Sequence, residues 1–159
     1  MTRLAVTGHR GLSEPTSTLV DNALRSEIGK RADGNLIGLS CLADGTDALF
    51  ARAILERGGA LHVIVPAQQY RDDLPADHHP IYDVLIAQAA EIIELDHVES
   101  NSDAHMDASL RMLADADELL AVWDGLPARG YGGTADVVSA ARERGIPVTV
   151  VWPAGAERD

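Results

Sequence analysis

Residues 123–134, WDGLPARGYGGT, have the composition of an anion-binding loop. Gly132 and Gly133 let the backbone approach a ligand closely, and an apolar run with helical spacing follows them. The first N–H groups of a helix and the positive end of its dipole suit a phosphate group. Thr134 can cap this helix, and Arg129 can add positive charge from the loop. The alternative is a plain turn with a solvated arginine.

A second candidate loop, TGHRG at residues 7–11, follows an apolar run directly. Gly8 permits unusual backbone angles, His9 offers a ring, and the planar guanidinium of Arg10 matches the geometry of a phosphate. The spacing is not G-x-G-x-x-G, so the dinucleotide-binding fingerprint is absent. We interpret the loop as a phosphate or ribose contact; the alternative is a tight turn with a solvated Arg10.

A third candidate loop, SCLADGTD, occupies residues 40–47. Asp44 or Thr46 can cap the helix that follows, and Gly45 opens the backbone near its start. For Asp47, a helix cap accounts for the residue without any ligand. The candidate ligand contacts in this loop are Ala43, Asp44, Gly45 and Thr46.

Other polar side chains are weaker candidates. Asp124 ends an apolar run and could accept hydrogen bonds from ribose hydroxyls or an amino group. Cys41 is the only cysteine and is expected to be a small packing residue rather than a nucleophile. Adjacent histidines rarely point at one ion, so His78 and His79 are not expected to bind a metal.

Length and charge narrow the class of protein. A chain of 159 residues predicts a single domain, residues 1–159, with a sizeable core. The formal net charge of −12 argues against a nucleic-acid partner, but one or two arginines can still bind a small phosphate ligand. No apolar run approaches the length of a secretory signal or a membrane span, which predicts a cytoplasmic protein with no membrane partner.

Strands and helices are expected to alternate along the chain. Six apolar runs predict strands at residues 3–8, 35–40, 60–66, 91–95, 118–124 and 147–152. Ser13 caps the first helix, with Pro15 in its first turn, and Asp33-Gly34 ends it. Further helices are expected at residues 46–59, 81–90, 106–116 and 135–144. Polar composition predicts a loop or short flap at residues 67–80 and a loop at residues 96–104.

This alternation predicts an α/β fold: a doubly wound, Rossmann-like, mostly parallel sheet of about six strands with helices on both faces. Ligands of such sheets bind at the carboxyl ends of the strands, near the switch in strand order. The three candidate loops follow the first, second and fifth strands. We therefore expect them to meet at one edge of the sheet.

Together these segments resemble the SLOG superfamily, the Rossmann-like group that includes the lonely-guy cytokinin-activating enzymes, the DNA-processing protein DprA and the YpsA-like proteins. LSCLADGTDALFA, residues 39–51, is similar to the DprA and YpsA signature S-G-x-A-x-G-x-D-x-x-A, with Cys41 in place of its glycine. ADADELLAVWDG followed by GYGGTADVV resembles the second signature, and VTGHR is similar to YpsA-like starts. The match covers nearly the whole chain in order.

The resemblance implies a nucleotide or nucleotide-derived ligand, such as AMP, ADP-ribose or NAD. It places this ligand along Gly8–Arg10, Gly45–Asp47 and Gly132–Thr134, the last acting as a phosphate-binding loop. It is consistent with a homodimer, because SLOG enzymes commonly pair. DprA binds single-stranded DNA, but the charge of −12 leads us to expect no such partner here.

The chain departs from the enzymes of the superfamily. Lonely-guy enzymes carry P-G-G-x-G-T-x-x-E, whose glutamate is catalytic, and an Arg-Lys pair before a helix methionine. Val137 stands at the glutamate position, and Ala108 and Ser109 stand in place of the pair. The leading hypothesis is therefore ligand binding or sensing. The alternative is a phosphoribohydrolase-type N-glycosidase with an atypical catalytic acid, for which the candidates are Asp136, Asp124 and Asp47.

Overall fold

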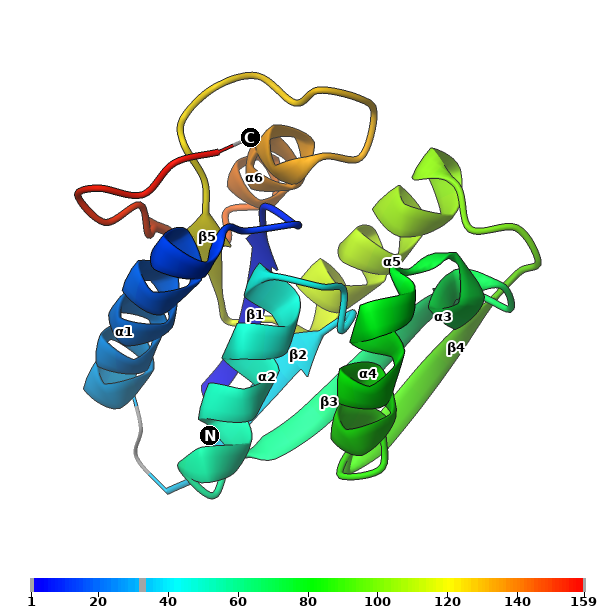
Figure 1. Cartoon of the computed structure of the whole chain (residues 1–159), viewed down its shortest axis with the longest axis horizontal. Helices are drawn as coiled ribbons and strands as arrows, with labels where there is room; N and C mark the ends of the chain where they lie inside the picture. The colour runs from blue at the N-terminus through cyan, green and yellow to red at the C-terminus, as the bar shows by residue number, and fades with distance from the viewer. Residues whose placement is uncertain (1, 32–33, 159) are drawn as a thin grey trace.

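The computed structural model describes residues 2–31 and 34–158, which form a six-stranded parallel sheet with helices on both faces (Figure 1). The order across the sheet is β4-β3-β2-β1-β5-β6, so the strand order switches between β1 and β5. The expected doubly wound α/β fold is confirmed. The strands are β1 (Thr2–Gly8), β2 (Leu36–Ser40), β3 (Ala60–Ala67), β4 (Glu91–His97), β5 (Glu118–Val122) and β6 (Val148–Val150).

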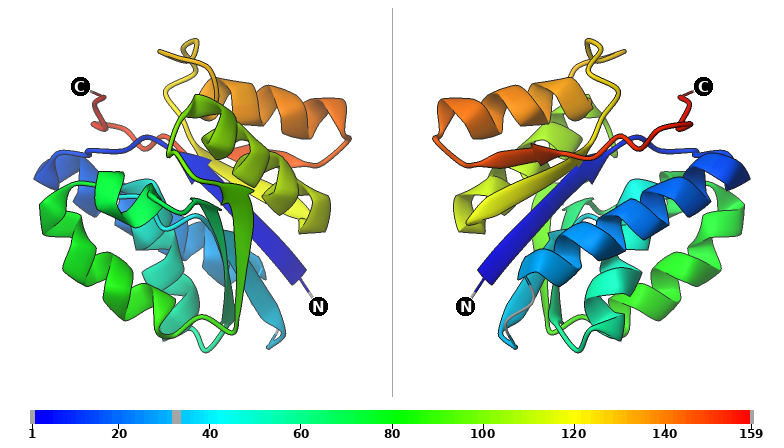
Figure 2. Two further views of the ribbon diagram at one scale, coloured as in Figure 1. Left: turned by 90° about the vertical axis from the view of Figure 1, so that its right-hand side faces the viewer. Right: turned by 90° about the vertical axis from the view of Figure 1, so that its left-hand side faces the viewer.

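Helices cover the sheet in two layers (Figures 1 and 2). The helices are α1 (Glu14–Arg31), α2 (Thr46–Glu56), α3 (Tyr70–Asp73), η1 (Ala76–His78), α4 (His79–Ile86), α5 (Ser102–Asp115) and α6 (Thr134–Glu143). The layer of α1, α2 and α4 packs on one face, and α5 and α6 pack on the other. In the described part of the chain, no helix combines the length and the apolar character needed to span a membrane.

Alternation along β1 explains why both faces are buried. Leu4 and Val6 pack against α1 and α2, whereas Ala5 between them packs against α5 and α6. Successive side chains of a strand point to opposite faces, so a central strand needs apolar residues at every position. On α1, Val20, Leu24 and Ile28 recur every four residues and are fully buried.

The start of α1 is as predicted. Ser13 accepts hydrogen bonds there through its carbonyl and its hydroxyl, from the N–H groups of Ser17 and Thr16. The helix ends at Arg31, and Asp33 of the predicted stop lies outside the described residues.

The polar stretch predicted as a loop at residues 67–80 is largely helical, so that prediction is wrong. It contains α3, η1 and the start of α4, and it buries Tyr70, Leu74 and His78. These three side chains recur every four residues, a helical spacing that the surrounding charged residues obscured. The predicted loop at 96–104 is also shorter, because Asn101 caps α5 by accepting the N–H of Ala104 at 2.9 Å.

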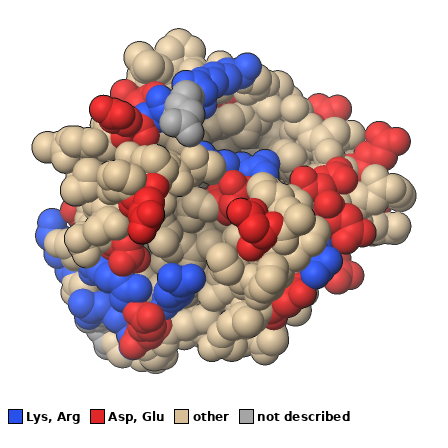
Figure 3. All heavy atoms as spheres, in the orientation of Figure 1, with Lys and Arg blue, Asp and Glu red and all other residues tan. Residues whose placement is uncertain are grey.

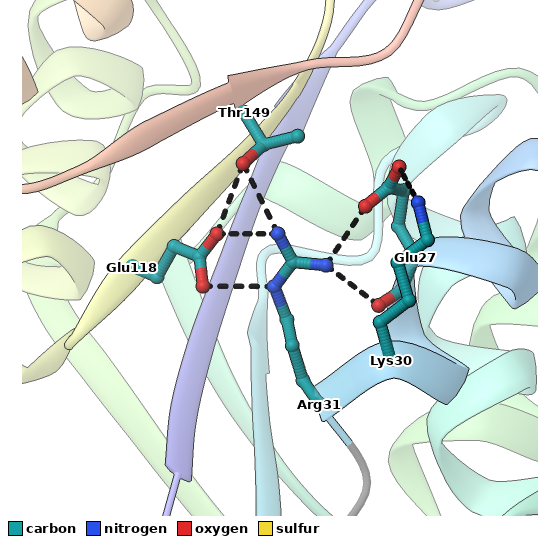
Figure 4. Close-up of polar contacts among 5 residues, drawn as sticks. All are labelled: Glu27, Lys30, Arg31, Glu118 and Thr149. Atoms are coloured by element: carbon teal, nitrogen blue, oxygen red, sulfur yellow. Dashed lines mark hydrogen bonds and ion pairs between the residues drawn. The ribbon is translucent and has the colours of Figure 1, made fainter.

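An ion-pair network joins the end of α1 to the start of β5, at the edge of the sheet opposite the carboxyl ends (Figure 4). Arg31 donates Nε and Nη2 to the carboxylate of Glu118 at 2.8 and 2.6 Å. It also donates Nη1 to Glu27 at 2.8 Å and Nη2 to the hydroxyl of Thr149 at 3.1 Å. The side chains of Arg31 and Glu118 are 18% and 22% exposed, which limits screening by solvent.

We expect Glu118→Gln to lower the free energy of unfolding at pH 7 by about 1–2 kcal/mol, because it breaks a two-pronged, partly buried ion pair. The Arg31 guanidinium lowers the pKa of Glu118. The stability from this pair is therefore present above the carboxyl's usual pKa of 4.5 and is lost as the pH falls through the lowered value. Urea unfolding at pH 7 and pH 3 measures both effects.

Glu56→Gln is the matched control, because Glu56 pairs with Arg25 and its side chain is 53% exposed. It should change stability by less than about 0.5 kcal/mol. Equal losses from the two variants would contradict the role assigned to the Arg31 network.

Candidate functional site

A cavity of about 520 Å³ opens where β1, β2 and β3 end, at the carboxyl edge of the sheet. Its volume lies in the range of small-molecule sites. The three candidate loops meet there, beside α5 and the segment after β6. Nine of the predicted ligand contacts line this cavity: Gly8, His9, Arg10, Ala43, Asp44, Arg129, Gly132, Gly133 and Thr134. Three others, Gly45, Thr46 and Asp124, do not line it.

His9 connects the three loops. Its carbonyl accepts the N–H and the hydroxyl of Thr46, at 3.3 and 3.0 Å. Its Nε2 accepts the backbone N–H of Asp124 at 3.1 Å, and its Nδ1 faces the hydroxyl of Thr134 at 3.5 Å. A neutral imidazole that accepts at Nε2 carries its proton on Nδ1. Burial and the nearby charge of Arg158 lower the pKa of His9, which keeps the ring neutral near pH 7.

The first residue of α2 is bound by the backbone of His9. Both polar groups of Thr46 bind the His9 carbonyl, and Gly45 is the N-cap without any side-chain cap. The predicted capping of α2 is therefore wrong. Asp44 instead binds Arg10 and the N–H of Gly11, the latter at 3.0 Å. The Asp44 carboxylate therefore binds Arg10 and Gly11 of the loop after β1 and not the N–H groups at the start of α2.

Asp47 also does not cap α2. It accepts the N–H of Ala43 at 3.3 Å from within the first turn of the helix, and its side chain lies on the wall of the cavity. Leu42, the residue before Ala43, has a φ of +59°, which is a strained value for a branched residue. The hydroxyl of Ser40 accepts the N–H of Leu42 at 3.1 Å and so supports this conformation.

The start of α6 faces the cavity with available donors. Among residues 2–31 and 34–158, the backbone N–H groups of Thr134 and Ala135 find no acceptor. The predicted cap by Thr134 is wrong, because Gly133 is the N-cap and the Thr134 hydroxyl lies beside His9. Unpaired N–H groups at a helix start attract anions. At the start of α2 the carboxylates of Asp44 and Asp47 line the cavity, whereas no carboxylate of the described residues does so at the start of α6, so α6 provides the better anion site of the two.

Three arginines line the cavity. Arg10 is bound to Asp44 through Nε and Nη2, at 2.9 and 2.8 Å. Arg158 has a single contact to Asp124, at 3.5 Å, and Arg129 makes no ion pair or hydrogen bond with the described residues. Figure 3 shows basic side chains around a hollow in the upper part of this face, while acidic side chains gather on the side of α3 and β4.

The three candidate acids are in different environments. Asp136 accepts the N–H of Gly132 at 2.9 Å, and Asp124 accepts the N–H of Leu126 at 3.0 Å. Neither lines the cavity. Asp47 does, and burial raises its pKa to about 7, against the opposing effects of the Ala43 N–H and the Arg10 charge.

Cys41 lies beside Asp47 on the same wall. Burial and the charge of Asp47 raise the pKa of its thiol, which makes it a poor nucleophile. Its contacts with two core clusters support the interpretation as a packing residue. The adjacent His78 and His79 bond to the carbonyls of Leu42 and Leu74, at 2.9 and 3.0 Å.

Several cavity residues escaped the sequence analysis. Tyr70 and His105 lie edge to face with ring centroids 5.7 Å apart, and Met112 also lines the cavity. They belong to α3 and α5, elements that do not begin directly after a glycine loop. Arg158 was missed because no motif surrounds it. The helical spacing of Tyr70, Leu74 and His78 was the one usable signal.

No family model and no curated protein matches the sequence. Solved structures do share the fold. DNA processing protein A (DprA) from Helicobacter pylori is 14% identical, with a TM-score of 0.70 over 98% of this chain and 68% of that one. DprA from Streptococcus pneumoniae is 16% identical, with a TM-score of 0.65 over 94% of this chain and 50% of that one. This chain thus spans half the length of the pneumococcal protein.

The molybdenum cofactor binding protein from Rippkaea orientalis is 16% identical, with a TM-score of 0.58 over 94% of this chain and 75% of that one. Likeness at these identities establishes the fold. The resemblance to the SLOG superfamily is confirmed at that level, since DprA is among the proteins on which it was based.

The expectation that the net charge excludes a nucleic-acid partner is wrong. DprA from Helicobacter pylori, which has this fold, binds single-stranded DNA. Net charge is a property of the whole chain, whereas a ligand responds to the charges nearest to it. Arg10, Arg129 and Arg158 gather at one cavity, although the formal net charge of the chain is −12.

Proposed function

We propose that the protein binds a nucleotide or nucleotide-derived ligand, such as AMP, ADP-ribose or NAD, in the cavity at the carboxyl edge of the sheet. One observation carries this proposal: the unpaired N–H groups at the start of α6 share the cavity with Arg129 and Arg158. Backbone donors and guanidinium groups at one place are the donors that a phosphate requires.

Other side chains of the cavity support a ligand with more than a phosphate. Tyr70, His105 and Met112 contribute aromatic and thioether surface to the cavity wall. Burial and the charge of Arg10 lower the pKa of His105, so its ring stays neutral and can lie against a base. Such side chains bury aromatic ring systems well.

We expect AMP, ADP-ribose or NAD at millimolar concentration to raise the melting temperature. A ligand that binds only the native state stabilises it by about 2.7 kcal/mol at a hundredfold excess over Kd. Differential scanning fluorimetry measures the shift. Adenosine is the matched control, because it keeps the base and ribose and lacks the phosphate.

An oligonucleotide of single-stranded DNA belongs in the same screen. Stabilisation by the oligonucleotide, with none by the three nucleotides, would replace the proposal with a nucleic-acid function. A screen in which AMP, ADP-ribose and NAD all leave the melting temperature unchanged would also overturn it.

A second candidate function is hydrolysis of the N-glycosidic bond of a nucleotide. It is favoured by the position of Asp47, the one candidate acid that lines the cavity, and by its raised pKa. A carboxyl group that titrates near neutral pH can act as a general acid or base. Release of adenine from AMP, followed by chromatography, distinguishes hydrolysis from binding alone.

A further inference from the structure

The C-terminal segment, residues 151–158, returns across the carboxyl edge of the sheet. Val151 is buried and donates its N–H to the carbonyl of Ala121 at 2.8 Å, in continuation of β6. The segment then passes the start of α1 and turns back towards α6 (Figures 1 and 2). It thereby connects the outer strand of the sheet to the cavity.

Thr16 fixes the last part of this segment. Its hydroxyl accepts the N–H of Glu157 at 3.1 Å and donates to the carbonyl of the same residue at 3.3 Å. Thr16 is 2% exposed and lies in the first turn of α1, away from the cavity wall. A buried hydroxyl that satisfies both backbone groups of one residue holds that residue in a defined orientation.

The next residue, Arg158, reaches the cavity. Its side chain lines the cavity wall and is 18% exposed, and its Nη1 lies 3.5 Å from Oδ2 of Asp124. A guanidinium has five N–H donors, so one long contact leaves most of them for a ligand. Arg10 differs, because its Nε and Nη2 are already bound to Asp44.

We propose that Arg158 is an anion-binding residue of this cavity, delivered by the C-terminal segment, and that Thr16 is the positioning residue that holds it there. The anion is a phosphate or pyrophosphate group at the start of α6. The identification of that group as part of a nucleotide rests on the function proposed above. Asp124 acts as the internal partner that keeps the guanidinium in place, rather than as a ribose acceptor.

Inorganic pyrophosphate is the probe for this site, measured by isothermal titration calorimetry. We expect Arg158→Ala to weaken its binding by about tenfold or more, the loss typical of a charge-assisted contact. Arg144→Ala is the matched control. It removes the same charge from the far end of α6, where Arg144 bonds to the carbonyl of Ala140 and lies outside the cavity. It should change the affinity less than about twofold.

The role of Thr16 is tested by its coupling to Arg158. Thr16→Val removes the hydroxyl and should weaken pyrophosphate binding, whereas Thr16→Ser keeps the hydroxyl and should restore it. In the double variant Thr16→Val, Arg158→Ala, the Thr16 change should add no further loss, because its effect passes through Arg158. A merely structural effect of Thr16 would reduce the affinity equally with and without Arg158.

The outcomes separate this inference from the proposed function. Pyrophosphate binding that does not depend on Arg158, or that is absent from the wild type, overturns the inference even if nucleotides bind. Binding of pyrophosphate that depends on Arg158 supports the inference even if AMP, ADP-ribose and NAD fail. Additive losses from Thr16→Val and Arg158→Ala overturn the positioning role alone.

Discussion

Replacing Gly45 with alanine is expected to lower the free energy of unfolding by about 3 kcal/mol or more, combining backbone strain and overpacking. Gly45 has a φ of +84°, a value that costs a residue with a side chain about 1–2 kcal/mol. A Cβ there would lie 2.9 Å from the carbonyl oxygen of His9 and 3.1 Å from the Cα of Arg10. Both are backbone atoms, so the loop after β1 or the start of α2 must move. Urea unfolding measures the loss.

Gly58→Ala is the control for backbone strain alone. Gly58 follows α2 with a φ of +75°, and no atom lies within 4 Å of a Cβ built on it. Its replacement should cost about 1–2 kcal/mol, the strain by itself. The difference between the two variants reports the close approach of α2 to His9. Equal losses would show that this approach is not tight.

Replacing Asp47 with asparagine is expected to have the opposite effect and to stabilise the protein at pH 8. The expected gain in the free energy of unfolding is about 2–4 kcal/mol, since each unit of pKa shift corresponds to about 1.4 kcal/mol. Burial raises the pKa of Asp47 to about 7 from its usual 3.8. The stability associated with this group is therefore present below pH 3.8 and is lost as the pH rises through 7. Asparagine keeps an oxygen for the N–H of Ala43 and does not ionise.

The gain from Asp47→Asn should shrink as the pH is lowered from 8 to 4, which thermal unfolding across that range can follow. Asp44→Asn is the control, since it removes a carboxylate from the same loop but breaks the pair with Arg10. It should not stabilise the protein at any pH. A destabilising or pH-independent effect of Asp47→Asn would contradict the assigned pKa. If AMP hydrolysis occurs, Asp47→Asn should also abolish it.

A carboxylate that costs stability at its working pH is usually retained for a function. Asp136 and Asp124 have partners within the protein that account for them, whereas Asp47 has one N–H and an exposed side towards the cavity. Measured stability can thus indicate which acid matters before any ligand is identified.

The sheet and the meeting point of the three loops followed from the sequence because they depend on local patterns. Apolar runs of strand length identified β1 to β6, and the rule for parallel sheets placed their following loops at one edge. Helix capping was less predictable. Thr46 and Thr134 stand where caps belong, but His9 offers each of them a tertiary partner that no local pattern indicates.

The polar residues of the cavity that come from distant elements could not be predicted. Tyr70 lies in a stretch whose composition suggested a loop, and Arg158 reaches the cavity through the contact between Glu157 and Thr16. That contact joins residues 141 positions apart in the sequence. The expectation drawn from net charge was wrong for a related reason. The total of −12 does not show that arginines gather at one edge of the sheet.

The order of the strands also governs the way the site is assembled as the chain folds. β2 reaches β1 across a single helix, so Thr2 lies beside Leu36. β5 reaches β1 only after β3, β4 and all the helices from α2 to α5 have been placed, and Leu4 then lies beside Glu118. Closing the longer loop costs more entropy, and long-range parallel pairing is slow. The cavity lies next to this late junction, where His9 meets Asp124 and Thr134. A ligand of this cavity would therefore bind the completed sheet and slow its unfolding, while leaving the early folding steps of β1 to β4 unchanged.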